Sequence, residues 1–325
     1  MMDKFVNFET VTAGNELPLV VSPKNANLSL LNWAADNRDW IKTGLSVHGA
    51  ILFRGFADSH LDGFEKFTAI VSDRVMDYRE RSSPRHTVKN NIYTSTDYPP
   101  SQKIFPHNEH SYSKTFPQKL FFYCSIPPNS GGETPIADCR RILRRLSPET
   151  VNKFRDKKWM YVRNFGDGFG LPWETVFQTD DKNTVENYCR QNLIQFEWKP
   201  DNHLKTRQIR PVVIDHPVTG EEIWFNHLTF FNVATLDPNI REIMLEAFPE
   251  EDLPNNTYYG DGTKIEDHVL EELQSAYLNE LVTFKWQQND IILLDNILTA
   301  HARNEFTKPR EILFSMADPF TRNDL

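Results

Sequence analysis

The stretch from Ile104 to Ser113, IFPHNEHSYS, places two histidines and a glutamate within four consecutive positions. If this stretch is extended, residues two apart project to the same side, so His107 and Glu109 share one face while Asn108 and His110 share the other. An imidazole and a carboxylate on one face can hold a single metal ion. The pair needs a third ligand from elsewhere in the chain.

The carboxyl-terminal segment LLDNILTAHARNEFTKPREILFSMAD offers that ligand in His301, which follows the apolar strand DIILLDN. Two histidines and one carboxylate leave coordination positions open for a 2-oxo acid and O₂, as in non-haem Fe(II) oxygenases. Arg310 begins the next strand and could pair bidentately with the far carboxylate of 2-oxoglutarate. The hydroxyl of Thr134, in GGETPIAD, could share that carboxylate.

Other interpretations stay open on spacing alone. The chain holds 10 histidines and 45 acidic residues, so chance His-x-Glu pairs are expected. A single histidine after a strand is more often a hydrogen-bonded structural residue. The same ligands would suit a zinc-dependent hydrolase, although the sequence has no His-Glu-x-x-His motif. A non-catalytic jelly-roll protein that binds a partner is a further alternative.

Short strand-like runs separated by turns dominate the chain. They are GAILFRGF (49–56), KLFFYCSI (119–126), KWMYVRNF (158–165), IRPVVID (209–215), EIWFN (222–226), LVTFKW (281–286), DIILLD (290–295) and EILFSMA (311–317). Helical spacing or capping signals occur at 59–74, 147–154, 236–248 and 265–281. IDHPVTGEEI predicts a hairpin that turns at Thr219-Gly220. This order favours a mainly β fold, an antiparallel barrel or jelly roll with surrounding helices.

Composition predicts a globular protein, with 39% hydrophobic and 12% aromatic residues. We expect a single domain over residues 1–325 with a helical insertion around 137–280. The 36 basic and 45 acidic residues are interspersed and give a net charge of −9. Without a basic stripe, a nucleic-acid partner is not expected.

Hydropathy and cysteine usage indicate the cellular compartment in which we expect the protein. No window of 18 apolar residues and no signal-peptide layout is present, so we expect no membrane span and a cytoplasmic location. Cys124, Cys139 and Cys189 are odd in number and widely spaced, which predicts reduced, buried thiols. The number of subunits stays open.

Several blocks in a fixed order resemble the taurine dioxygenase/TfdA (TauD/TfdA) superfamily, most closely its SyrP-like branch. The resemblance runs from about Gly49 to the carboxyl terminus. Its blocks are GAILFRGF, HNEHSYSKTFPQKLFFYCSIPPNSGGETPIADCRRIL, GLPWETVFQTDD, TRQIRPVVIDHPVTGEEIWFNH and LLDNILTAHARNEFTKPREILFSMAD.

This resemblance implies a double-stranded β-helix (jelly-roll, clavaminate synthase-like) core that uses Fe(II), 2-oxoglutarate and O₂. It implies that His107, Glu109 and His301 are metal ligands and catalytic residues, and that Thr134 and Arg310 bind 2-oxoglutarate. His110 stands where an apolar residue is usual. Related iron halogenases have Ala or Gly in place of the carboxylate, so the resemblance implies hydroxylation, desaturation or epoxidation rather than chlorination.

The SyrP-like branch is associated with tailoring amino acids for nonribosomal peptides, sometimes on a carrier protein. The resemblance therefore implies an amino-acid or aminoacyl-thioester substrate, a carrier-protein partner and a role in antibiotic biosynthesis. We predict Arg210, Asn226 and Tyr93 as substrate contacts. Further polar candidates near the opening are Arg79, Arg81, Arg85, Arg207, His227 and Thr94.

Overall fold

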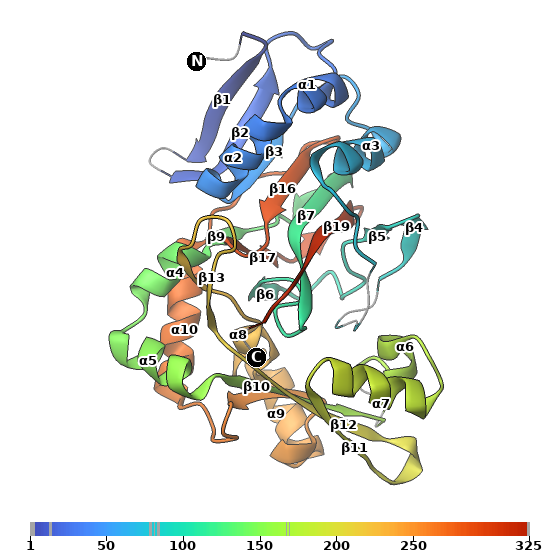
Figure 1. The fold of residues 1–325 in the computed structure, drawn as a ribbon, viewed down its shortest axis with the longest axis vertical. Helices are drawn as coiled ribbons and strands as arrows, with labels where there is room; N and C mark the ends of the chain where they lie inside the picture. The colour runs from blue at the N-terminus through green and yellow to red at the C-terminus, as the bar shows by residue number, and fades with distance from the viewer. Residues whose placement is uncertain are drawn as a thin grey trace.

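The computed structural model describes residues 4–12, 15–77, 80, 82, 85–166, 168 and 170–323. Its largest sheet crosses the upper half of Figure 1 and pairs antiparallel throughout, except between β2 and β3. In spatial order the strands are β1 (Val6–Thr12), β2 (Asn15–Pro23), β3 (Ala50–Phe53), β16 (Ile291–Asp295), β7 (Thr115–Ile126), β19 (Glu311–Thr321), β5 (Ile92–Thr94) and β4 (Thr87–Lys89).

Three helices cover one face of this sheet: α1 (Leu30–Asp36), α2 (Arg38–His48) and α3 (Leu61–Val71). In the central strand β16, Ile291 and Leu293 pack against these helices, whereas Ile292 and Leu294 pack in a second cluster on the opposite face. A strand that is covered on both faces has no solvent-facing positions. Burial on both sides therefore explains why DIILLD is apolar without alternation.

A smaller sheet provides the strands that carry the two candidate histidine ligands. Its strands are β6 (Ile104–His107), β17 (Thr299–Arg303) and β9 (Ile136–Asp138), with β17 in the middle. Ile136 packs in the cluster on the inner face of the large sheet. The two sheets form a jelly-roll core, so the prediction of a mainly β fold with surrounding helices is confirmed.

The segment between β9 and β16, where a helical insertion is expected, contains strands as well as helices. Its sheet has the order β11-β12-β10-β15, and β13 pairs with β14. The elements are α4 (Cys139–Arg145), α5 (Pro148–Lys157), β10 (Trp159–Phe165), α6 (Trp173–Phe177), α7 (Lys182–Gln191), β11 (Ile194–Trp198), η1 (Pro200–Asn202), β12 (Leu204–Arg210), β13 (Val213–Asp215), β14 (Glu222–Trp224), α8 (Leu228–Phe231), η2 (Val233–Thr235), α9 (Pro238–Ala247), η3 (Glu250–Asp252), β15 (Asn255–Tyr259) and α10 (Asp267–Glu280). A two-stranded ladder of β8 (Ser130–Gly131) and β18 (Phe306–Thr307) completes the assignment.

Local signals in the sequence account for several of these boundaries. Ser147 caps α5 by accepting a hydrogen bond from the backbone N–H of Thr150, and Asp237 caps α9 in the same way. The hairpin of β13 and β14 is confirmed. The strand predicted at 281–286 is wrong, because only Val282 forms an isolated bridge, to Ile136.

The three cysteines are free and buried, as expected, and burial raises the pKa of each thiol to about 12. Such thiols are poor nucleophiles at neutral pH. In the part of the chain that the structure describes, every helix is too short or too polar to cross a bilayer.

Candidate metal centre and its cavity

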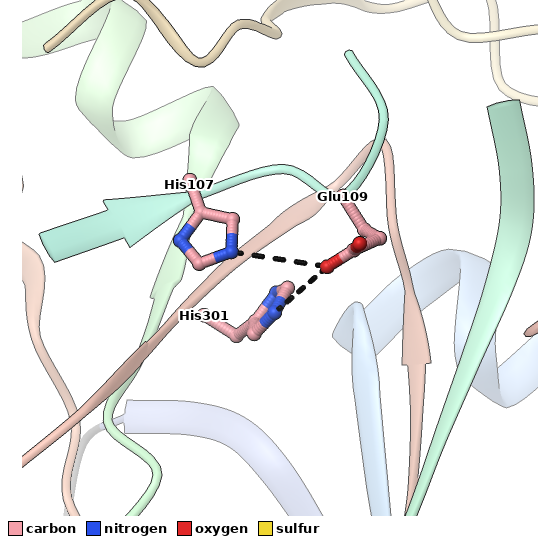
Figure 2. Close-up of side chains that lie close together, drawn as sticks. All are labelled: His107, Glu109 and His301. Atoms are coloured by element: carbon pink, nitrogen blue, oxygen red, sulfur yellow. Dashed lines mark ion pairs between the residues drawn. The ribbon is translucent and has the colours of Figure 1, made fainter. Parts of the chain in front are cut away.

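The register of the smaller sheet brings the two histidines together, because His301 on β17 lies directly opposite His107 on β6. Their ring centroids are 4.4 Å apart. One carboxylate oxygen of Glu109, Oε2, lies 3.8 Å from His107 Nε2 and 3.7 Å from His301 Nε2, as Figure 2 shows. Ligand atoms of the three residues all lie within 4.8 Å of one another.

Glu109 reaches the histidines from a turn. Strand β6 ends at His107 and the chain turns from Glu109 onward, so the extended conformation considered for His107 to His110 is wrong beyond His107. Asn296, which is fully buried, holds the turn. Its Oδ1 accepts a hydrogen bond from the Glu109 backbone N–H at 2.8 Å, and its Nδ2 donates to the Glu109 carbonyl at 2.9 Å. Asn296 thereby positions the carboxylate beside both histidines.

The hydrogen bonding and charge of the three groups suit a metal ion. His107 Nδ1 donates to the carbonyl of Phe105 at 2.8 Å, which leaves Nε2 directed at Glu109. Burial would raise the pKa of Glu109, but the positive charge of the Arg85 guanidinium holds it well below its usual range. Burial lowers the pKa of His301 well below its usual value. A neutral imidazole and an ionised carboxylate are the forms that bind Fe(II).

A cavity of about 500 Å³ opens from these ligands, and Arg310 and Thr134 also line it. Arg310 Nε donates to the carbonyl of Gly132 at 2.8 Å. Burial, with the nearby charge of Arg303, lowers the pKa of Arg310 to about 10, so the guanidinium stays charged at neutral pH. Thr134 accepts a hydrogen bond from Trp286 Nε1 at 3.2 Å.

Gly132, in the GGET segment, allows Arg310 this position. Its φ is +70°, and a Cβ there would lie 2.9 Å from Arg310 Cδ and 2.8 Å from Phe306 Cβ. Any other residue would strain the backbone and displace the arginine. The structure thus brings Arg310, Thr134 and the three candidate ligands to one cavity.

The further polar residues that line the cavity include Arg85, His227 and Arg303. The sequence nominates Arg85 and His227 only as general candidates near the opening, and it does not nominate Arg303. Arg303 donates to the backbone carbonyls of Tyr98, Pro99 and Gln102 at 2.6 to 2.9 Å, which fixes that loop beside the cavity. Its place two residues after His301, on the same strand, is the sequence signal that could have identified it.

The three residues predicted as substrate contacts, Arg210, Tyr93 and Asn226, are not among those that line this cavity. Arg210 is fully buried, and its guanidinium donates to the carbonyls of Tyr112, Ile209 and Asn192. Tyr93 packs in the core cluster on the inner face of the large sheet. Asn226 is buried and caps the start of α8 by accepting from the backbone N–H of Leu228.

The other polar candidates are also placed. Arg207 pairs with Glu197 beyond the cavity, and Thr94 Oγ1 accepts from the backbone N–H of His86. Arg79 and Arg81 lie outside the described residues.

An apolar wall, formed by Phe230, Leu236, Ile240 and Met244, closes the side of the cavity contributed by α8, α9 and the turn between them. The structure describes α9 in full, and none of its ten residues is buried. Ile240 and Met244 are one helical turn apart and line the cavity, whereas Ile243 is 61% exposed. The part of this wall that α9 contributes is therefore attached only loosely to the protein core.

Comparisons with known proteins agree with this geometry. The family model described as "Taurine catabolism dioxygenase TauD, TfdA family" matches residues 14–316. The dapdiamide synthesis protein DdaC of Enterobacter agglomerans is 38% identical over 275 residues, which cover 85% of this chain and 84% of that protein. A clavaminate synthase-like protein of Arabidopsis thaliana is 28% identical over 317 residues, which cover 92% and 93%.

The fold also matches solved structures. PvcB of Pseudomonas aeruginosa superposes with a TM-score of 0.58 at 15% identity, over 97% of this chain and 92% of that one. A second structure describes PvcB as an Fe, alpha-ketoglutarate dependent oxygenase from an isonitrile synthetic pathway. The alternatives of a zinc-dependent hydrolase and a non-catalytic partner are set aside by the family match. This chain belongs to the TauD/TfdA family of Fe(II)- and 2-oxoglutarate-dependent oxygenases.

Proposed function

We propose that His107, Glu109 and His301 hold the Fe(II) of this oxygenase, and that Arg310 and Thr134 bind the distal carboxylate of 2-oxoglutarate. The observation that carries this proposal is the convergence of three buried ligand residues on the wall of a cavity that Arg310 and Thr134 also line. Two imidazoles and one carboxylate form the ligand set that leaves positions open for a co-substrate and O₂.

Bound Fe(II), with 2-oxoglutarate and O₂, supplies the oxidising power for an unactivated C–H bond. The side chains supply position and exclude water. Arg310 offers a charged guanidinium to the carboxylate, and the Thr134 hydroxyl can donate to the same group while it accepts from Trp286. The ring of Phe122 lies 5.2 Å from His301, and that of Phe230 lies 5.0 Å from His107. These rings shield the ligands from solvent.

We propose hydroxylation, or a related desaturation or epoxidation, as the outcome. The support is Glu109, whose carboxylate would take the metal position that a halide needs in a halogenase.

For the substrate, we propose an amino acid or an aminoacyl group on a carrier protein, in secondary-metabolite or antibiotic biosynthesis. One support is the 38% identity to a protein named for dapdiamide synthesis. The other is the cavity lining, where Ser95 and Thr96 can bind a polar group and the apolar wall can bind an aliphatic one.

The test begins with binding. Thermal shift with Fe(II) and the inert co-substrate mimic N-oxalylglycine under nitrogen would screen amino acids, because a ligand of the folded state raises the melting temperature. Succinate release and O₂ uptake would then be measured with each compound that binds. We expect turnover that requires both Fe(II) and 2-oxoglutarate.

Glu109→Ala should abolish turnover, while Glu197→Ala, at an exposed glutamate on β11, should leave it unchanged. Full activity of Glu109→Ala with a compound that the wild-type protein oxidises would refute the ligand assignment.

A further inference from the structure

The two carboxylate oxygens of Glu109 face different histidines and share one arginine. Oε2 faces the Nε2 atoms of His107 and His301, at 3.8 and 3.7 Å. Oε1 instead lies 3.7 Å from Nε2 of His110. Arg85 Nη2 donates to the carboxylate as well, at 3.2 Å from Oε1 and 3.1 Å from Oε2. In Figure 2 both dashed lines from the histidines end on a single oxygen.

Both neighbours of Oε1 are held in place by packing. The Arg85 side chain is 5% exposed, and its guanidinium lies 4.2 Å from the centre of the Phe314 ring. The His110 ring stacks on Tyr112 with centroids 5.4 Å apart. Buried groups that are packed in this way cannot withdraw from Oε1 without leaving a gap in the core.

A glutamate can bind a metal ion through one oxygen or through both. If Glu109 used both, it and the two histidines would fill four of six positions, and 2-oxoglutarate would take the remaining two. No position would then remain for O₂. If Glu109 used Oε2 alone, one position would stay open after 2-oxoglutarate binds. The number of glutamate oxygens on the metal therefore decides whether the oxygenase can work.

We propose that Arg85 and His110 are positioning residues that restrict how Glu109 can bind the metal: Arg85 Nη2 lies nearly equidistant from the two carboxylate oxygens, where a metal bound by both would lie, and His110 lies beside Oε1, so that Glu109 presents only Oε2. This inference rests on the proposed role of His107, Glu109 and His301 as ligands. It gives a function to His110, the residue that departs from the family pattern. It also assigns Arg85, which lines the cavity, to the metal centre rather than to the substrate.

The experiment counts water molecules on Mn(II), which replaces Fe(II) in the purified protein, by pulsed electron paramagnetic resonance in ¹⁷O-enriched water. The wild-type protein should hold three waters, and one after 2-oxoglutarate binds. Arg85→Gln should lose one water in each state, leaving two and then none. Arg207→Gln, at an arginine on β12 that pairs with Glu197, is the matched control and should retain three and one.

A second variant keeps the proposal testable if Arg85→Gln does not fold. His110→Phe keeps a ring on Tyr112 but removes the nitrogen that faces Oε1, and it should give an average below three waters. Three waters in both variants would overturn the inference while leaving the ligand assignment intact. Failure of the wild-type protein to bind Mn(II) would instead overturn the proposed function.

Discussion

At one end of the cavity, His107 and His301 lie on paired strands, and Asn296 fixes the backbone of Glu109 with buried hydrogen bonds. At the other end, Ile240 and Met244 lie on α9, a helix without a buried residue. The first end is part of the sheet β6-β17-β9, which is packed within the protein core. The second is attached through few contacts and can change without disturbing the sheet.

The two ends of the cavity meet different structural requirements of an oxygenase. Metal ligands must stay within a few tenths of an ångström of one geometry, which rigid elements provide. A wall that contacts the substrate can vary from one relative to another, because a poorly buried helix contributes little to stability.

Leu293→Ala should lower the free energy of unfolding by about 2–5 kcal/mol, because it opens a cavity in a fully buried strand. Met244→Ala should lower it by less than about 1 kcal/mol, because α9 buries little apolar surface. Urea unfolding followed by circular dichroism would compare the two variants. Equal losses would mean that α9 is part of the core and that the contrast is mistaken.

Asn296→Ala should lower the free energy of unfolding by about 2–3 kcal/mol, because it leaves the buried N–H and carbonyl of Glu109 without partners. Mn(II) affinity should fall by about 10- to 100-fold, as is typical when a group that orients a ligand is removed. Calorimetric titration of Mn(II) into the folded variant would measure this affinity, with Asn187→Ala on α7 as the exposed control. Unchanged metal affinity would show that Glu109 does not depend on Asn296.

The sequence alone predicts some features of the metal centre and not others. His107, Glu109 and His301 could be nominated because two of them are two residues apart and the third follows an apolar strand. Arg310 was visible at the start of the last strand. The turn after His107 and its contact with Asn296 could not be predicted, because residues 187 apart in sequence meet there only through the sheet.

The positions of the predicted substrate contacts away from the cavity have a related cause. Arg210 looks like a surface arginine in sequence, yet its guanidinium is satisfied by backbone carbonyls in the interior. Tyr93 is on a short strand whose direction of burial depends on its pairing with β19. Which face of a strand meets the cavity is decided by register and packing, and these are not local properties of the sequence. The core strand DIILLD, in contrast, was recognisable from composition alone.

Arg310→Gln should weaken 2-oxoglutarate binding by about 10- to 100-fold without changing Mn(II) affinity, because a charge-assisted bond to the co-substrate is lost and the metal ligands are untouched. Thr134→Val should weaken it by only about 3- to 10-fold, the effect of one neutral hydrogen bond. Calorimetric titration of 2-oxoglutarate into the Mn(II)-loaded protein would rank the two variants by their affinity for 2-oxoglutarate. Arg144→Gln on α4 serves as an exposed control, and a reversed ranking would contradict the assigned roles.

The smallest effect concerns an ion pair outside the metal centre. Glu266, beside Lys153 and the hydroxyl of Tyr259, has its pKa lowered to about 2 by the hydrogen bond from Lys153, which outweighs the effect of burial. Because the folded pKa is below the unfolded one, the pair stabilises the protein above about pH 5 and loses its effect as the pH falls towards 2. Its side chain is 41% exposed, so solvent screening keeps the contribution below about 1 kcal/mol.

Glu266→Gln should therefore lower the free energy of unfolding slightly at pH 7, and the difference from wild type should shrink as the pH falls. Urea unfolding of both proteins at several pH values would measure this difference in the free energy of unfolding. At the metal centre, in contrast, the Arg85 and Glu109 side chains are at most 5% exposed, so solvent screens that ion pair only weakly. A pH-independent loss in Glu266→Gln would show that packing, rather than charge, is what this residue contributes at the start of α10.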